Sequence, residues 1–238
     1  MVPFRYQYRR EAVTSGRLPS ERRHWTVVVI SALCYDSADG RDPGMSGQQK
    51  RTRWNWDDYV AWEATQPVRH ELVGGQVHAI GCGTAAHDRI ANALRVELTV
   101  RLRGGNCRPH GPDMKVRTGT GNGRYPDALI DCGPYVPDAF EAQEPVAVFE
   151  VLSRSTAWVD QGKKLRDYDA TPGIRHYVLI SQDELRVMVY TRNDSGRLDI
   201  RDAMLLEERY AILELSGIGI SIPLAEIYSG LDFLSSAP

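Results

Sequence analysis

Hydrophobic and polar residues follow helical and strand-like periods from about residue 51 to the end of the chain. Apolar residues recur four apart between His87 and Arg103, which is typical of a helix with one buried face. Asn55 is a common helix N-cap, and Pro172 with Gly173 marks a helix end. The pattern predicts helices over residues 55–66, 87–103, 158–170 and 224–228.

The strand signals lie between these helices. Gly74 and Gly75 separate two apolar runs and predict a two-residue hairpin turn. Strands are expected over residues 69–73, 76–80, 113–117, 127–131, 146–152, 174–181 and 185–191, with weaker strands running to about residue 215. Alternation of strands with helices predicts an α/β fold in which a mixed central sheet is flanked by helices.

The first 50 residues have a different character from the rest. They combine arginines, a Gly/Pro/Asp-rich run and one apolar patch, without a sustained period. We therefore expect residues 1–50 to be a poorly ordered extension of a domain spanning 51–238, with Met45 as an alternative start.

Composition places the chain among ordinary globular proteins, since 42% of residues are hydrophobic and 25% are charged. No apolar run reaches the length of a membrane span, so we expect a cytoplasmic protein. The four cysteines are far apart and form no Cys-x-x-Cys pair. This spacing argues against a zinc cluster and favours free thiols in a reducing compartment.

Charge is distributed unevenly, although the formal net charge is only −2. Residues 87–117 contain seven Lys or Arg against three acids, whereas residues 121–150 contain one Arg against six acids. A basic segment followed by an acidic one suits an enzyme that holds a polyanion beside a cation, although a solvated surface gives the same pattern.

Glu150 interrupts an apolar run, Pro145–Leu152, that is typical of a central strand buried on both faces. A buried carboxylate is costly unless it is paired, protonated or bound to a cation. Asp127 follows Pro126 at the start of another strand, on the same face as Leu129 and Asp131. Carboxylates from two neighbouring strands can hold a hard divalent cation. A structural ion pair or a strand end open to solvent would also explain Glu150.

Asp160, Lys164 and Tyr168 recur at four-residue spacing, so one helix face carries all three. Lys163 lies about 100° away around the helix. Without further context, Asp160 and Lys164 are as well explained by a simple surface ion pair.

Six short segments occur in an order that resembles the Uma family of restriction endonucleases, within the PD-(D/E)XK nuclease superfamily. They are His-Glu-Leu-Val-Gly-Gly at 70–75, His87, Tyr-Pro-Asp at 125–127, Glu-Val-Leu-Ser-Arg-Ser-Thr at 150–156, Asp160-x-x-x-Lys164-x-x-x-Tyr168, and Thr-Pro-Gly-Ile-Arg-His-Tyr-Val-Leu-Ile at 171–180. The resemblance implies a restriction-endonuclease-like core and a metal-dependent nuclease that acts on nucleic acid, with DNA expected.

The resemblance also implies roles for individual residues. Asp127 and Glu150 would be the acids that bind Mg²⁺ or Mn²⁺. Leu152 occupies the usual position of the superfamily's lysine, so Lys164 on the following helix would replace it. Glu71 matches a further acid near the site, and His87 a histidine at a helix start. Strand exposure for Glu71 and a helix cap for His87 are equally simple explanations.

Two other functions remain open from the sequence. The chain could be a nuclease-fold protein that has lost catalysis and serves as a DNA-binding or assembly module. A homodimer is open for the nuclease as well as for this module. It could also be a glycosidase that uses Glu150 as acid and Asp127 as base. That function leaves Lys164 without a role, and aromatic residues make up only 8% of the chain.

Overall fold

The structure, a computed structural model, describes residues 53–81, 83–152, 161–231 and 233. Its helices are α1 (Trp56–Glu63), α2 (Ala85–Arg101), α3 (Gln161–Asp169), α4 (Leu224–Ile227) and the short 3-10 helix η2 (Ile200–Asp202). Its strands are β1 (His70–Val73), β2 (Gln76–Ala79), β3 (Arg108–His110), β4 (Val116–Arg117), β5 (Gly123–Arg124), β6 (Ala128–Asp131), β7 (Pro145–Leu152), β8 (His176–Ser181), β9 (Val187–Thr191), β10 (Met204–Leu206), β11 (Ile212–Leu215) and β12 (Ile220–Pro223). The predicted extension at residues 1–50 lies outside the described residues.

Polar caps set where the first two helices begin. Asn55 caps α1 as predicted, because its side chain accepts a hydrogen bond from the Asp58 backbone N–H at 2.8 Å. Thr84 caps α2 in the same way and accepts from the His87 N–H. The second helix therefore begins at Ala85, two residues before the predicted start at His87.

A six-stranded mixed sheet forms the centre of the fold, in agreement with the predicted class. Its strand order is β10-β9-β8-β7-β6-β3. Only β7 and β8 run parallel, and the helix α3 lies between them in sequence. The predicted central strand is β7, which has neighbours on both sides, while β3 and β10 are the edges of the sheet.

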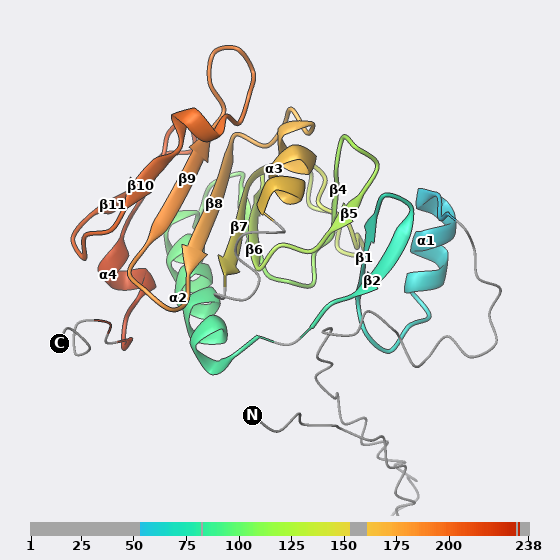
Figure 1. Cartoon of the computed structure of the whole chain (residues 1–238), viewed down its shortest axis with the longest axis horizontal. Coiled ribbons are helices and arrows are strands. Elements are labelled where there is room, and N and C mark those ends of the chain that lie inside the picture. Colours follow the sequence, from blue (N-terminus) through green and yellow to red (C-terminus); the bar gives the residue numbers. More distant parts are fainter. Residues whose placement is uncertain (1–52, 82, 153–160, 232, 234–238) are drawn as a thin grey trace, which may run out of the picture.

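The predicted hairpin around Gly74 and Gly75 is present, but it lies in a second sheet. This sheet has the order β2-β1-β5-β4 and is antiparallel throughout. The strands β4 and β5 are two residues long, so the strand expected over residues 113–117 shrinks to Val116–Arg117. Figure 1 shows the second sheet and α1 at one end of the molecule, with α3 between the two sheets.

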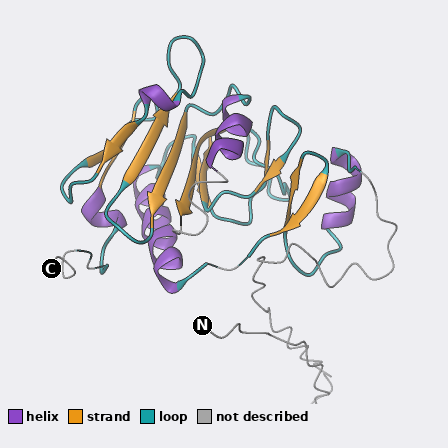
Figure 2. Cartoon of the chain, in the orientation of Figure 1, coloured by secondary structure: helices purple, strands orange, loops and turns teal. Residues whose placement is uncertain are grey.

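The two faces of the large sheet are covered by different elements. On one face, Leu94 and Leu98 of α2 pack against Phe149 of β7. The β11–β12 hairpin and α4 belong to the same hydrophobic cluster. On the other face, Tyr168 of α3 packs against Val148 of β7 and its neighbours. Figure 2 shows these helices on either side of the strands. The large sheet is therefore the layer between two separate hydrophobic clusters.

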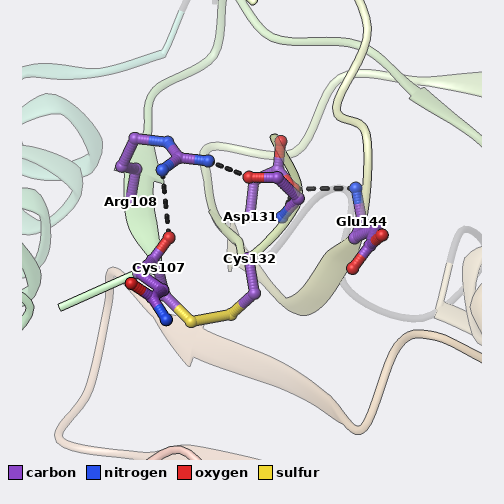
Figure 3. The surroundings of a disulfide bond; sticks show 7 residues. Cys107, Arg108, Asp131, Cys132 and Glu144 are labelled. Atoms are coloured by element: carbon purple, nitrogen blue, oxygen red, sulfur yellow. Dashed lines mark hydrogen bonds between the residues drawn. A yellow bond between two sulfur atoms is a disulfide. The ribbon is translucent and has the colours of Figure 1, made fainter. Parts of the chain in front are cut away.

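A disulfide joins Cys107 and Cys132, so the prediction of free thiols is wrong for this pair. The physical reason is strand pairing. Arg108 of β3 lies opposite Asp131 of β6, which brings the two flanking cysteines face to face despite a sequence separation of 25 (Figure 3). Cys34 and Cys82 lie outside the described residues.

Within these same described ranges, no helix combines the length and the apolar character that crossing a membrane would require.

Candidate active site

The predicted site residues come from both sheets and from the helix between them. Glu71 lies in β1, Asp127 directly precedes β6, Glu150 lies in β7 and Lys164 lies in α3. The segment Tyr125–Asp127 leads from the second sheet into the large one. The site thus lies where the two sheets come together, beside α3, which is located between them (Figure 1).

Glu150 is the buried centre of this group, with 4% of its surface exposed. Its Oε2 accepts a hydrogen bond from the Lys164 ammonium at 2.8 Å, and its Oε1 accepts one from the Tyr168 hydroxyl at 3.0 Å. Lys164 and Tyr168 are four residues apart, so one face of α3 supplies both donors. The predicted helix face is confirmed for these two residues, whereas Asp160 lies outside the described residues.

Asp127 stands opposite Glu150 across the two central strands. Ala128 pairs with Phe149 in the antiparallel β6–β7 ladder, so the preceding residue, Asp127, comes level with Glu150. The Val151 backbone N–H donates to Asp127 Oδ2 at 2.7 Å, which fixes the carboxylate at the strand end. On its other side, His87 Nε2 lies 3.3 Å from Asp127 Oδ1.

Glu71 joins the site through two positive side chains. Its Oε2 accepts from the Arg124 guanidinium at 2.7 Å, and its Oε1 lies 3.9 Å from the Lys164 Nζ. Arg124 is almost completely buried and also donates to Asp167 at 2.8 Å. Asp167 accepts further hydrogen bonds from Thr120 and Asn122. An unbroken chain of charged contacts therefore runs from Asp167 to Glu150.

The surroundings change the ionisation of these groups. Burial raises the pKa of Glu150 to about 7; the Lys164 charge counteracts this rise and the Asp127 charge adds to it. Burial disfavours the charged form of Lys164, yet the carboxylates of Glu150 and Glu71 keep its pKa above the usual value. Lys164 is therefore a charged ammonium at neutral pH. The hydrogen bond to Asp127 raises the pKa of His87 despite its burial.

The charges of the cluster leave room for a cation. Four carboxylates, those of Glu71, Asp127, Glu150 and Asp167, face only two permanent cations, Arg124 and Lys164. When Glu150 is ionised, two negative charges remain without a permanent counter-ion, and a protonated His87 would offset that of Asp127. In the described part of the chain, no three His, Cys, Asp or Glu side chains are grouped closely enough to hold a metal ion. Mg²⁺ commonly uses one or two carboxylates and keeps several waters, so Asp127 and Glu150 fit this ion.

Sequence patterns alone do not show which of the neighbouring charged residues join the site. Asp131 does not join the site, because a register shift separates it from Ile130 and its carboxylate accepts from the Gly133, Gln143 and Glu144 backbone N–H groups. Arg124 and Asp167 were missed. The only sequence signal for Arg124 is its place three residues before Asp127, and Asp167 has none beyond its position next to Tyr168.

Comparisons with known proteins identify the family and the fold of this chain. The Uma2 family, described as "Putative restriction endonuclease", matches residues 56–225. The chain belongs to the Uma2 family. This family is one of nucleases by its description, and its match covers every element from α1 to the start of α4.

Relatives of this Uma2 protein include an uncharacterized protein of Synechocystis sp., 33% identical over 180 residues, which are 74% of this chain and 92% of the relative. A solved structure from Anabaena variabilis, titled a putative nuclease belonging to DUF820, has a TM-score of 0.58 and 15% identity. It covers 73% of this chain and 96% of its own. At that identity, the likeness establishes the nuclease-like α/β fold alone.

Proposed function

We propose that this Uma2 protein is a metal-dependent nuclease that hydrolyses phosphodiester bonds of nucleic acid, with DNA as the expected substrate. The observation that carries the proposal is the buried contact between Lys164 and Glu150, directly opposite Asp127. A lysine beside two carboxylates at a strand end combines an activating positive charge with a pair of oxygen ligands. Family membership supports the same class of reaction.

Asp127 and Glu150 are the residues that would hold Mg²⁺ or Mn²⁺. The ion would polarise a phosphodiester oxygen and lower the pKa of a bound water. The protein's own groups prepare the carboxylates for this task. Tyr168 fixes one oxygen of Glu150, and the Val151 N–H fixes one oxygen of Asp127. Both acids therefore keep their positions, Asp127 directly before β6 and Glu150 near the C-terminal end of β7.

Lys164 would orient the attacking water and offset the negative charge that develops on the phosphate. Its ammonium is held charged by Glu150 and Glu71. Glu71 is itself kept ionised, because Lys164 and Arg124 lower its pKa against the effect of burial. We therefore assign Glu71 the role of holding the Lys164 charge at the site, and His87 the role of holding Asp127.

A cleavage assay on single- and double-stranded DNA tests the reaction. Purified protein should cut in the presence of Mg²⁺ or Mn²⁺ and stop when EDTA is added. Lys164→Met should lower the rate by about a hundred-fold or more, the usual effect of losing one transition-state donor. Lys163→Met is the matched control, since the neighbouring lysine is exposed and should be dispensable.

Three outcomes would contradict these roles. Cleavage that persists in EDTA would show that the reaction does not depend on a metal ion. If Lys163→Met were inactive and Lys164→Met active, Lys163 and not Lys164 would be the lysine that acts in the reaction. Mn²⁺ should also raise the melting temperature of the parent by mass action but not that of Asp127→Asn or Glu150→Gln, and an equal rise in all three would remove these acids from metal binding.

A further inference from the structure

A groove of about 480 Å³ lies between the helix α2 and the edge strand β3 of the large sheet. Its helix wall includes Asn92, Arg95 and Thr99, with Arg103 just beyond the C-terminal end of α2, and its strand wall ends with His110 and Gly111. The wall residues within α2 run from Asn92 to Val100, so the groove follows the helix for about 12 Å. No part of the proposed chemistry uses it.

The groove carries positive charge without a balancing acid. None of its lining residues is Asp or Glu. Arg103 is exposed and makes no ion pair within the described residues. Among the residues that the structure describes, the Arg95 guanidinium bonds to uncharged oxygens alone, those of Ala91 and Asn92. The acid nearest in sequence, Glu97, is paired with Arg101. Both arginine charges are thus available to an anion.

Most other basic residues of the segment 87–117 already have partners inside the protein. Arg101 and Lys115 are paired with the carboxylates of Glu97 and Glu63, while Arg89 and Arg108 donate to the Ser229 and Gly133 carbonyls, which do not line the groove. Acids therefore neutralise only part of the basic segment seen in the sequence, and several of its charges have no carboxylate partner within the described residues. Two of these, Arg95 and Arg103, line the same groove, which makes it the natural binding place for a polyanion beside α2.

Both walls of the groove lead toward the proposed active site. His87, in the first turn of α2, contacts Asp127. On the strand side, His110 of β3 lies opposite Leu129 of β6, only two residues after Asp127. A strand that left the site past the start of β6 would meet the groove at Gly111. A side chain at Gly111 would meet Arg95, so glycine lets this guanidinium lie close against the strand.

The remaining lining suits a sugar-phosphate chain. Val96 and Val100 are 58% and 54% exposed and form an apolar strip beside the arginines. Asn92 and Thr99 add uncharged hydrogen-bonding groups. Burial lowers the pKa of His110, so this imidazole is neutral at pH 7 and can serve as a hydrogen-bonding group. Phosphates would pair with the arginines, while sugars and base edges would cover the valines.

We propose that the α2–β3 groove binds the part of the nucleic-acid strand that flanks the bond to be cut. This inference rests on the proposed nuclease function and adds a substrate-binding surface to it. It predicts that long substrates bind more tightly than short ones, because only a strand that extends beyond the active site can reach Arg103.

Binding without cleavage provides the test. Fluorescence anisotropy in EDTA measures the affinity of labelled 8-mer and 30-mer DNA and RNA for the parent and for Arg95→Gln/Arg103→Gln. Each phosphate contact contributes about 0.7 to 0.9 to the slope of log K against log salt. The double variant should therefore lose about 1.4 to 1.8 from this slope and bind the 30-mer about 25- to 60-fold more weakly at 0.1 M salt. The 8-mer should change less.

Arg209→Gln is the control, since Arg209 is exposed on the turn between β10 and β11, at the opposite edge of the large sheet. It should leave affinity and salt slope unchanged. The proposal is overturned if the parent binds no nucleic acid, or if the double variant keeps the parental slope. It is also overturned if the double variant changes the oligomeric state and not the affinity, because a second copy of the chain would then occupy the groove. A protein that binds nucleic acid through the groove but does not cleave it would contradict the proposed nuclease activity and would not contradict the proposed binding site.

Discussion

Arg124 offers the sharpest test of how the site is held together. Its side chain is 2% exposed and bridges two carboxylates, Glu71 at 2.7 Å and Asp167 at 2.8 Å. The variant Arg124→Gln removes the positive charge and leaves both acids buried. Breaking a buried ion pair by removing one partner typically costs about 3 to 5 kcal/mol, because the remaining charge has no counter-ion.

We expect a value near the lower end of that range. Asp167 would keep its hydrogen bonds from Thr120 and Asn122, and Glu71 would keep the Tyr125 N–H and the nearby Lys164 charge. A loss of about 3 kcal/mol in the free energy of unfolding corresponds to a fall of about 6 to 12 °C in melting temperature for a domain of this size. Urea unfolding with an unchanged m-value would measure the loss.

Arg186→Gln is the matched control, because Arg186 also bridges two carboxylates, Glu184 and Glu207, but at the surface. All three of these side chains are nearly half exposed, so the control should cost no more than about 1 kcal/mol. Adding Asp167→Asn to Arg124→Gln should restore part of the lost stability, because it removes one of the two carboxylate charges that Arg124 no longer neutralises. Equal losses in Arg124→Gln and Arg186→Gln would refute the view that burial makes this ion pair important.

Three further predictions concern the metal, the disulfide and α3. Since Glu150 has a pKa raised to about 7 and must lose its proton to bind a cation, Mn²⁺ should raise the melting temperature much more at pH 8 than at pH 6; an equal rise at both would contradict this linkage. Cys107→Ser should lower the free energy of unfolding by about 3.5 kcal/mol, the effect expected for a 25-residue loop, and reductant should bring the parent to the same value in urea unfolding. Asp167→Asn should lower kcat about ten-fold or more, because Asp167 anchors α3 and Arg124 beside the site. Asp169→Asn, on the same helix but bonded to Arg197 and the Leu198 N–H, should keep its kcat, and an equal loss would make the effect one of helix stability.

The order of the main elements follows from local patterns. Four-residue apolar spacing sets α2, and the Gly74–Gly75 pair sets the β1–β2 turn, because both signals act over a few neighbouring residues. The apolar run around Glu150 likewise indicates a central strand, and β7 is one. Family resemblance then adds Asp127, Lys164 and Glu71 to the site, which composition and spacing alone leave ambiguous.

Long-range pairing decides the features that the sequence does not specify. The strands β4 and β5 are two residues long and have no period of their own, so only their neighbours define the second sheet. The Cys107–Cys132 bridge depends on the β3–β6 register, and the role of Asp131 depends on a shift in the β6–β7 ladder.

For the charged site as well, the sequence determines some features and only the tertiary structure determines the others. The sequence alone determines that a carboxylate at Glu150 must be compensated, because a buried charge without a partner is too costly. It does not determine the chain of contacts from Glu150 through Lys164, Glu71 and Arg124 to Asp167. These residues come from β7, α3, β1 and β5, and only the meeting of the two sheets around α3 brings their charges within contact distance.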